Sequence, residues 1–272
     1  LIENDRSSEN LEIVLRSAIA KGLVSVVYQP IVDGQTQAPV GYETLMRLSD
    51  FEGRNITPAV FIPIAERTGA IIDLGLWVLE QACRDFRDVG LGSFVGVNVS
   101  AVQLREPSFP LRVSEIVARH ELAPHQLVIE ITESEDVVSE AQAVRSIQQI
   151  RGLGVQVWLD DFGAGFAGLA WLRHFSFDVV KIDRSFLHDC HTAKGLRMLE
   201  DMVRLLRNSG HRVLIEGVET REQQRLLKRL RVDLMQGFLF GAPAAAASRH
   251  GSGPAGAPAG RVRLPSTSKA MS

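Results

Sequence analysis

The sequence predicts a single α/β barrel, a closed (β/α)₈-type fold in which helices surround a sheet. Two observations lead to this fold class. Short runs rich in β-branched residues alternate regularly with amphipathic stretches of helical length, which is typical of crossover units and a parallel sheet buried on both faces. About eight such runs occur in roughly 240 residues, which fits a closed barrel better than an open doubly wound sheet. A short loop joins the first two runs, so this pair is expected to be antiparallel.

The predicted elements follow one another in a regular order. Residues 10–22 predict a lead-in helix after an N-terminal linker at 1–9. Thr57 and Pro58 suit the start of the next helix, and Gly90 suits the end of the one after it. The predicted strands are 24–32, 40–48, 94–100, 127–134, 155–161, 177–187, 212–219 and 234–240. The predicted helices among them are 57–69, 72–90, 111–121, 140–154, a short one near 168–174, 196–210 and 221–230.

Composition agrees with one large folded domain. The chain has 272 residues, of which 45% are hydrophobic and 23% charged, enough for a substantial core. A formal net charge of −2 argues against a nucleic-acid polymer as partner. No apolar run reaches the roughly 18–20 residues that span a bilayer, and no signal-peptide core is present. The distant Cys83 and Cys190 indicate neither a disulfide framework nor a zinc site, so a cytoplasmic location is expected.

The last segment of the chain differs from the rest. Residues 244–272 are rich in Ala, Gly, Pro and Ser, and their charged side chains are all basic. Such a segment buries too little apolar surface to offset its ordering entropy, so a disordered basic tail is expected. The barrel domain is therefore predicted to span residues 10–243.

Polar residues interrupt the apolar runs near the ends of the predicted strands. Burying one ionised group alone costs several kcal/mol, so a repeated pattern requires a shared compensation. In a parallel barrel the carboxyl ends of the strands converge on one rim, where active sites lie. Several oxygen ligands without histidine fit a hard divalent cation such as Mg²⁺ or Mn²⁺. The residues concerned are Glu43, Asn98, Glu130, Asp160, Asp161, Lys181, Asp183 and Glu216.

Each of these residues also has a simpler interpretation. Glu43, Glu130 and the adjacent Asp160 and Asp161 fit solvent-exposed strand positions, and Asn98 fits a turn or cap. Lys181 fits a rim salt bridge to Asp183, Asp183 a structural role, and Glu216 a pair with a basic neighbour. A cation between Asp160 and Asp161 would explain why two like charges stand side by side.

Eight ordered motifs carry a resemblance that decides among these interpretations. They are "YQPIVD…GYETLMR", "FIPIAERTGAI", "VNVSAVQL", "LVIEITES", "LDDFGAGFAGL", "VVKIDRSF", "IEGVET" and "MQGFLFGAP". In this order, from about residue 10 to 243, they are similar to the EAL-domain cyclic di-GMP phosphodiesterase family of bacteria. The resemblance implies a modified TIM barrel with one antiparallel strand. It also implies hydrolysis of cyclic di-GMP to linear pGpG with two Mg²⁺ or Mn²⁺ ions.

The resemblance also implies a role for each matching residue. One ion would be held by Glu43, Asn98, Glu130 and Asp160, and the second by Asp160, Asp161 and Glu216. Lys181 matches the lysine that contacts the attacking water, and Glu216 also matches a general base. The implied substrate contacts are Gln29, Arg47 and Gln236, and the implied supports are Glu133, which anchors the loop after Asp161, and Glu219.

The sequence departs from the family pattern in two places. Ala164, Ala167 and Gly168 replace hydroxyl residues in the loop after Asp161, and Thr44 replaces a small residue in the signature. Losing a helix-capping hydroxyl costs about 0.5–2 kcal/mol, so slower catalysis is expected without loss of any candidate ligand. Thr44 is expected to be tolerated.

Two other functions remain open at this point. One is a receptor that binds cyclic di-GMP without cutting it, but a receptor would not need all five of the acidic residues Glu43, Glu130, Asp160, Asp161 and Glu216. The other is a metal-dependent barrel lyase that acts on a small carboxylate, which would explain the acidic residues but not the ordered motifs. The resemblance further implies a homodimer formed near the loop and helix after Asp161. It also implies an upstream sensory or cyclase-like domain, within a cytoplasmic protein or the cytoplasmic part of a membrane-tethered one.

Overall fold

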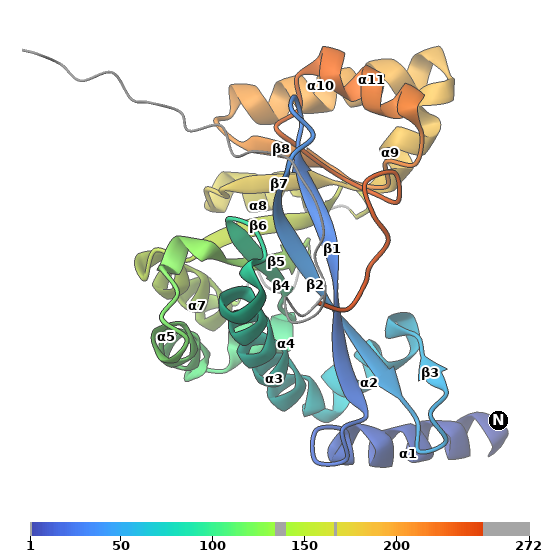
Figure 1. The fold of residues 1–272 in the computed structure, drawn as a ribbon, viewed down its shortest axis with the longest axis vertical. Coiled ribbons are helices and arrows are strands. Elements are labelled where there is room, and N and C mark those ends of the chain that lie inside the picture. The colour runs from blue at the N-terminus through green and yellow to red at the C-terminus, as the bar shows by residue number, and fades with distance from the viewer. Residues whose placement is uncertain (1, 134–139, 166–167, 247–272) are drawn as a thin grey trace, which may run out of the picture.

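The computed structural model describes residues 2–133, 140–165 and 168–246, which form a closed eight-stranded α/β barrel (Figure 1). The strand β1 pairs antiparallel with both β2 and β9, and the other barrel pairs, from β2–β4 through β8–β9, are parallel. The predicted fold class, including its one antiparallel strand, is confirmed. The barrel strands are β1 (Val24–Asp33), β2 (Pro39–Ser49), β4 (Phe94–Asn98), β5 (Leu127–Thr132), β6 (Gln156–Phe162), β7 (Val179–Ile182), β8 (Arg212–Ile215) and β9 (Leu234–Gln236).

Helices surround the barrel, and a short strand β3 (Asn55–Ile56) pairs antiparallel with the end of β2. Among the described residues, none of the helices is long and apolar enough to cross a membrane. The helices are α1 (Ile2–Ser17), α2 (Pro58–Thr68), α3 (Ala70–Asp85), α4 (Ala101–Arg105), α5 (Phe109–Arg119), α7 (Ala141–Gly152), α8 (Gly168–His174), α9 (Arg184–His188), α10 (Ala193–Asn208) and α11 (Arg221–Leu230). Short π or 3₁₀ turns lie at Phe86–Gly90, Pro124–Gln126 and Asp189–His191.

Several strands end earlier than predicted, and two of the largest differences, in β7 and β8, lie where the site begins. The run 177–187 divides into β7 and α9 because the Asp183 carboxylate accepts a hydrogen bond from the backbone of Ser185, at 3.0 Å, and caps the helix. The run 212–219 stops after Ile215, since Gly217 adopts a left-handed conformation with φ of 67°. Residues after these strands are thereby free to turn into the barrel mouth.

Apolar side chains close the amino-terminal half of the barrel. They come from the inward-facing positions of successive strands, and Phe94 packs edge-on against Trp158 with ring centroids 4.9 Å apart. Because side chains alternate along a strand, the next inward position lies two residues further toward the mouth. This plug consists of Ile31, Phe94, Val128, Trp158, Val179, Leu214 and Leu234.

A second apolar cluster supports the far end of the β1–β2 hairpin. Residues of α1, including Leu11 and Leu15, pack with Val24 and Leu48 of the hairpin and Phe61 of α2. Figure 1 shows α1 crossing the hairpin at the end away from the barrel.

Ordered elements cross both of the predicted domain boundaries. The helix α1 runs through the predicted linker boundary at residues 9 and 10. Ala244, the first residue of the predicted tail, pairs with Tyr28 of β1 in an isolated bridge. The rest of that tail from residue 247 lies outside the described residues, so its predicted disorder stays a prediction.

Candidate active site

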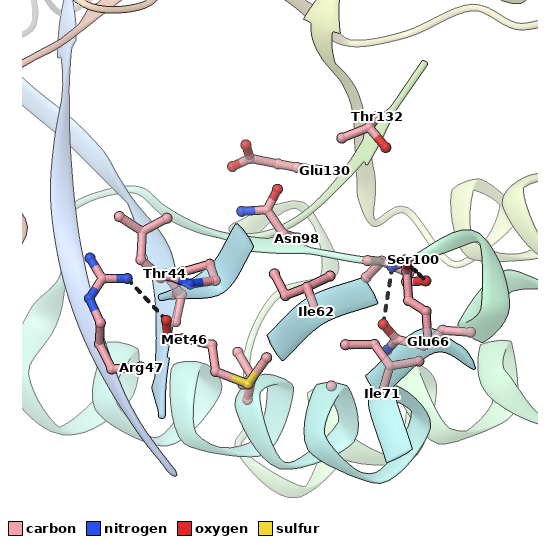
Figure 2. Close-up of a pocket in the computed structure, with 16 residues that line it drawn as sticks. Thr44, Met46, Arg47, Ile62, Glu66, Ile71, Asn98, Ser100, Glu130 and Thr132 are labelled. Carbon is pink, nitrogen blue, oxygen red and sulfur yellow. Dashed lines mark hydrogen bonds between the residues drawn. The ribbon is translucent and has the colours of Figure 1, made fainter. Parts of the chain in front are cut away.

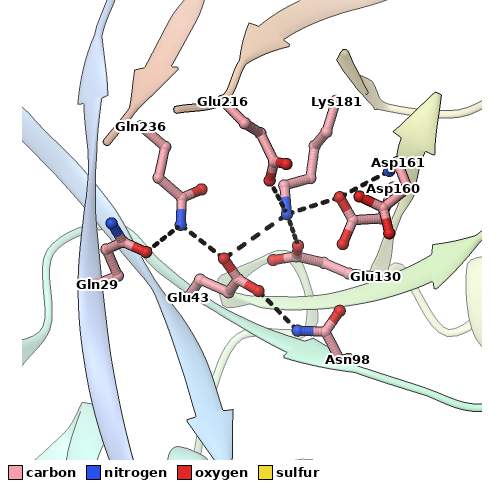
Figure 3. A network of polar contacts seen from close by, with 9 residues as sticks. All are labelled: Gln29, Glu43, Asn98, Glu130, Asp160, Asp161, Lys181, Glu216 and Gln236. Atoms are coloured by element: carbon pink, nitrogen blue, oxygen red, sulfur yellow. Dashed lines mark hydrogen bonds and ion pairs between the residues drawn. The ribbon is translucent and has the colours of Figure 1, made fainter. Parts of the chain in front are cut away.

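A polar layer lies directly above the apolar plug at the carboxyl ends of the strands (Figure 3). Glu130, Asp160 and Lys181 each follow a plug residue by two positions, so the strand period itself places them inward. Gly96 of β4 leaves room for this layer, since a Cβ there would overlap Glu130 Oε1. Most of the predicted residues meet in this layer: Gln29, Glu43, Asn98, Glu130, Asp160, Asp161, Lys181, Glu216 and Gln236.

Asp161 reaches the layer only because the strand is irregular. Strict alternation would turn Asp161 away from Asp160, toward the outside of the barrel. The pairing of β6 with β7 shifts register between Leu159 and Phe162, and Asp161 has a φ of 54°. Aspartate tolerates this left-handed conformation better than most residues. The bulge therefore brings two consecutive carboxylates to one mouth, where ligand atoms of Asp160, Asp161 and Glu216 lie within 4.8 Å of one another.

Lys181 is the centre of the acidic cluster. Its ammonium Nζ lies 2.6 Å from Glu130 Oε2, 2.8 Å from Glu216 Oε1 and 2.9 Å from Asp160 Oδ1. Glu43 Oε2 lies further away, at 3.7 Å. The side chain of Lys181 is fully buried, so its charge is compensated only by these carboxylates. The alternative pairing of Lys181 with Asp183 is not what the geometry shows, because Asp183 caps α9.

Amide side chains hold Glu43 at the other side of the cluster. Asn98 Nδ2 donates to Glu43 Oε1 at 2.7 Å, and Gln236 Nε2 donates to Glu43 Oε2 at 2.6 Å. The same Gln236 nitrogen lies 3.2 Å from Gln29 Oε1. Both amides therefore orient the glutamate of the signature motif toward Lys181 and Glu130.

Burial changes the proton affinity of the carboxyl groups in the cluster. It raises the pKa of Asp161 to about 6, with the Asp160 charge as the next cause. It raises the pKa of Glu216 to about 8 against the opposing effect of Lys181, and it raises the pKa values of Glu130 and Asp160 as well. Burial by itself would lower the pKa of Lys181, but the surrounding carboxylates, Asp160 foremost, raise it well above its usual range.

The donor set fits hard divalent cations. Ligand atoms of Glu43, Glu130 and Asp160 lie within 4.8 Å of one another, and Asp160 is shared with the second group that contains Asp161 and Glu216. Glu130 Oε1 is buried without a hydrogen-bond partner among the described residues, as an oxygen reserved for a cation would be. Carboxylate and amide oxygens are the ligands that Mg²⁺ and Mn²⁺ prefer.

Two cavities flank the cluster. One, of about 230 Å³, lies between β2 and the helices α2 to α4 and is lined by Arg47 and Glu66 among others (Figure 2). The Glu66 carboxylate accepts a hydrogen bond from Ser100 Oγ at 2.6 Å. Arg47 itself donates to the carbonyl of Met46 at 3.0 Å. The second, of about 170 Å³, is lined by residues that include Gln29, Gln236 and Glu219, the last exposed at the rim.

Several lining residues were not identified from the sequence. In the second cavity they are Arg184, directly after the motif residue Asp183, and Phe238, whose side chain is 65% exposed. In the first they are Glu66, Ser100 and Thr132. All five lie within the quoted motifs, and this position in a motif was the signal that could have found them.

The loop after β6 is held from a neighbouring strand end. The Glu133 carboxylate accepts a hydrogen bond from the backbone N–H of Gly165. A Cβ at Gly168 would overlap Glu133 Oε2, so the glycine permits this close approach. Ala167 lies outside the described residues, whereas Ala164 donates its backbone N–H to the carbonyl of Asp161 at 3.0 Å.

The protein is an α/β barrel with one antiparallel strand and a cluster of acidic residues at its mouth. Comparison with known proteins identifies the family to which such a barrel belongs. The EAL domain model matches residues 14–243. The chain therefore belongs to the EAL domain family of cyclic di-GMP phosphodiesterases.

Individual relatives agree with the family. The chain is 34% identical over 247 residues to the bifunctional diguanylate cyclase/cyclic di-GMP phosphodiesterase MucR of Pseudomonas aeruginosa, covering 88% of this chain and 36% of that protein. It is 32% identical over 240 residues to the probable cyclic di-GMP phosphodiesterase PdeG of Escherichia coli, covering 85% and 47%. A solved complex of the MucR phosphodiesterase with c-di-GMP superimposes with a TM-score of 0.79 at 33% identity, covering 87% of this chain and 98% of that one. The chain spans about a third of the length of the first curated relatives it matches.

Proposed function

We propose that this protein hydrolyses cyclic di-GMP to linear pGpG with two divalent cations, Mg²⁺ or Mn²⁺, in bacterial second-messenger signalling. The proposal is based on two sets of three acidic residues that share Asp160 and lie around Lys181. The sets are Glu43, Glu130 and Asp160, and Asp160, Asp161 and Glu216. Two-cation sites of this kind serve phosphodiester hydrolysis. The cyclic di-GMP bound to the MucR phosphodiesterase supports the choice of substrate.

Each residue of the cluster has a place in the proposed mechanism. Glu43, Asn98, Glu130 and Asp160 would hold one cation, and Asp160, Asp161 and Glu216 the other. Bound there, the cations would lower the pKa of a water molecule and stabilise the charge that develops on the phosphoryl oxygens.

Lys181 and Glu216 handle the proton of the attacking water in this proposal. Lys181 Nζ, which lies among the carboxylates of the cluster, donates a hydrogen bond that orients the water. Glu216, whose carboxylate lies at the same mouth beside Lys181 and Asp160, accepts the proton that the water loses.

The substrate would lie across the mouth between the two flanking cavities. Arg47 is suited to a phosphate oxygen because its planar guanidinium offers two parallel donors. Gln29 and Gln236 line the opposite cavity, where amide groups pair with the polar edge of a base. Glu133 holds the loop after β6, and Glu219 supports the rim of the same cavity.

The direct test is incubation of the purified protein with cyclic di-GMP and either Mg²⁺ or Mn²⁺, followed by chromatography for pGpG. We expect product that disappears with EDTA and with Asp160→Asn, which removes the shared ligand. Asp201→Asn serves as control, because Asp201 is exposed on α10 and pairs with Arg204 outside the cluster. Binding of cyclic di-GMP without product would establish a receptor instead, and absence of binding would favour another metal-dependent barrel enzyme.

We also propose that two copies associate near the loop and helix after Asp161, that is, at α8. Leu169 on this helix is 61% exposed. Light scattering is expected to show a dimer, and a fully active monomer would contradict this proposal. The upstream sensory or cyclase-like domain and the cytoplasmic location stay predictions.

A further inference from the structure

A basic groove lies between the last turns of α10 and α11, away from the acidic mouth. Glu200, Val203, Arg204 and Arg207 of α10 line it together with Arg229 and Leu230 of α11. These two helices lie side by side in Figure 1, and Arg207 Nη1 donates to the carbonyl of Arg231 at 3.0 Å, which links them. Their last turns lead into the amino ends of β8 and β9, whereas the acidic cluster lies at the carboxyl ends.

The charge of this surface is opposite to that of the whole chain. The helices α10 and α11 contain eight Lys or Arg residues and three Asp or Glu residues, although the chain carries a formal charge of −2. A local excess of one sign on an otherwise acidic protein attracts ligands of the opposite sign. The barrel mouth does not use these residues.

The groove arginines have little of their charge compensated within the protein. Arg229 has no hydrogen-bond or ion-pair partner among the described residues. Arg204 pairs with Asp201 at 3.2 Å, but both side chains are about 70% exposed, so the pair is weak. Arg207 donates to a backbone carbonyl, which leaves its positive charge unpaired. Three guanidinium groups are therefore available to an external acidic group.

The groove is distinct from the face proposed for association of two copies. The groove residues lie on α10 and α11, whereas the association face lies at α8. A partner in the groove and a second copy at α8 therefore use different helices.

We infer that the α10–α11 groove is a docking site for an acidic segment of another protein, whose carboxylates pair with Arg204, Arg207 and Arg229. Guanidinium groups bind carboxylates through paired hydrogen bonds. The partly buried Leu230 between them offers an aliphatic contact for an apolar side chain of the segment. A phosphate polymer has no apolar side chain to place against Leu230, and the formal charge of −2 on the chain disfavours so densely charged a polyanion. A flat lipid surface does not enter a groove.

The test uses a fluorescein-labelled peptide of repeated Glu-Glu-Leu units and fluorescence anisotropy with the whole protein. We expect saturable binding that a Gln-Gln-Leu peptide does not show and that weakens at about 0.5 M salt. The variant Arg204→Gln/Arg207→Gln/Arg229→Gln is expected to bind at least about tenfold more weakly. A second variant, Arg204→Gln/Arg229→Gln, keeps the contact of Arg207 with Arg231 and is expected to show most of the loss.

The matched control is Arg87→Gln/Arg112→Gln/Arg145→Gln, which removes the same charge from exposed positions outside the groove. It is expected to bind the acidic peptide like the unchanged protein. Equal binding by the groove variants, or an equal loss in the control, would overturn the inference. So would groove-dependent binding of phosphatidylglycerol vesicles or of a single-stranded oligonucleotide when the peptide does not bind. Cyclic di-GMP hydrolysis enters none of these measurements, so the inference and the proposed function fail separately.

Discussion

At the scale of single residues, Lys181 decides whether the acidic cluster is stable. Three carboxylate oxygens lie within 2.9 Å of its buried ammonium. Removing one partner of a buried ion pair leaves uncompensated charge and costs about 3–5 kcal/mol. We therefore expect Lys181→Met, which keeps most of the length of the side chain, to lower the free energy of unfolding by that amount in EDTA.

Urea unfolding with and without Mn²⁺ measures this effect. Divalent cations supply positive charge to the same carboxylates, so excess Mn²⁺ is expected to recover most of the lost stability. Lys194→Met is the control, since Lys194 is exposed on α10 and has no ion-pair partner in the described part of the chain. If Lys181→Met unfolds in EDTA at the same urea concentration as this control, Lys181 does not stabilise the cluster.

The sequence predicts which site residues point into the barrel wherever the alternation of side chains along a strand is regular. Glu130, Asp160 and Lys181 each interrupt an apolar strand at an inward position, so their convergence follows from the barrel. The inward turn of Asp161 was not predictable from periodicity, because it depends on a bulge and a φ of 54°. Glu66 was missed because it lies on a helix, where a charged residue is ordinary.

At the scale of elements, the contact between the loop after β6 and the end of β5 requires a glycine. A methyl group at Gly168 would overlap Glu133 Oε2 and would lie 2.6 Å from the ring of Phe162. We expect Gly168→Ala to displace the Glu133 carboxylate from the N–H of Gly165 and to lower kcat several-fold, although alanine favours the helix α8. Steady-state hydrolysis of cyclic di-GMP measures kcat and KM separately.

Gly152→Ala provides the matched control for this substitution. It also adds a methyl group at a helix end, but there no atom lies within 4 Å of the new Cβ. It is expected to leave kcat unchanged. An unchanged kcat in Gly168→Ala would show that the contact of Glu133 with the loop does not affect turnover.

Element types were predictable from sequence more reliably than element ends. The helix at 221–230 has the predicted bounds because Thr220 accepts a hydrogen bond from Gln223 N, at 3.2 Å, and forms a capping box. The run 177–187, by contrast, contains both β7 and α9. Its apolar composition continues across Asp183, so only the capping contact of that residue marks where the strand ends.

At the scale of the whole molecule, the buried acidic groups link stability to pH. Asp161 and Glu216 have pKa values of about 6 and about 8, raised chiefly by burial, so the folded protein without divalent cations holds protons that the unfolded chain releases. Raised carboxyl pKa values stabilise the folded state fully below the unfolded pKa values, 3.8 and 4.5. That stabilisation is lost as the pH rises through about 6 and then through about 8.

We therefore expect the Tm in EDTA to fall by several degrees between pH 5 and pH 8.5. With saturating Mg²⁺ the fall is expected to shrink, because the cations compensate the carboxylate charges and bind more tightly once the protons have left. Differential scanning calorimetry across this range measures both profiles.

Glu216→Gln separates this cause from the titration of histidines elsewhere in the barrel. The variant lacks the carboxyl group whose pKa is about 8, so its decline in EDTA between pH 7 and pH 8.5 should be smaller than that of the unchanged protein. A Tm in EDTA that rises with pH would mean that the carboxyl groups are already ionised in the folded protein. Lys181 would then compensate far more negative charge than the raised pKa values of Asp161 and Glu216 imply.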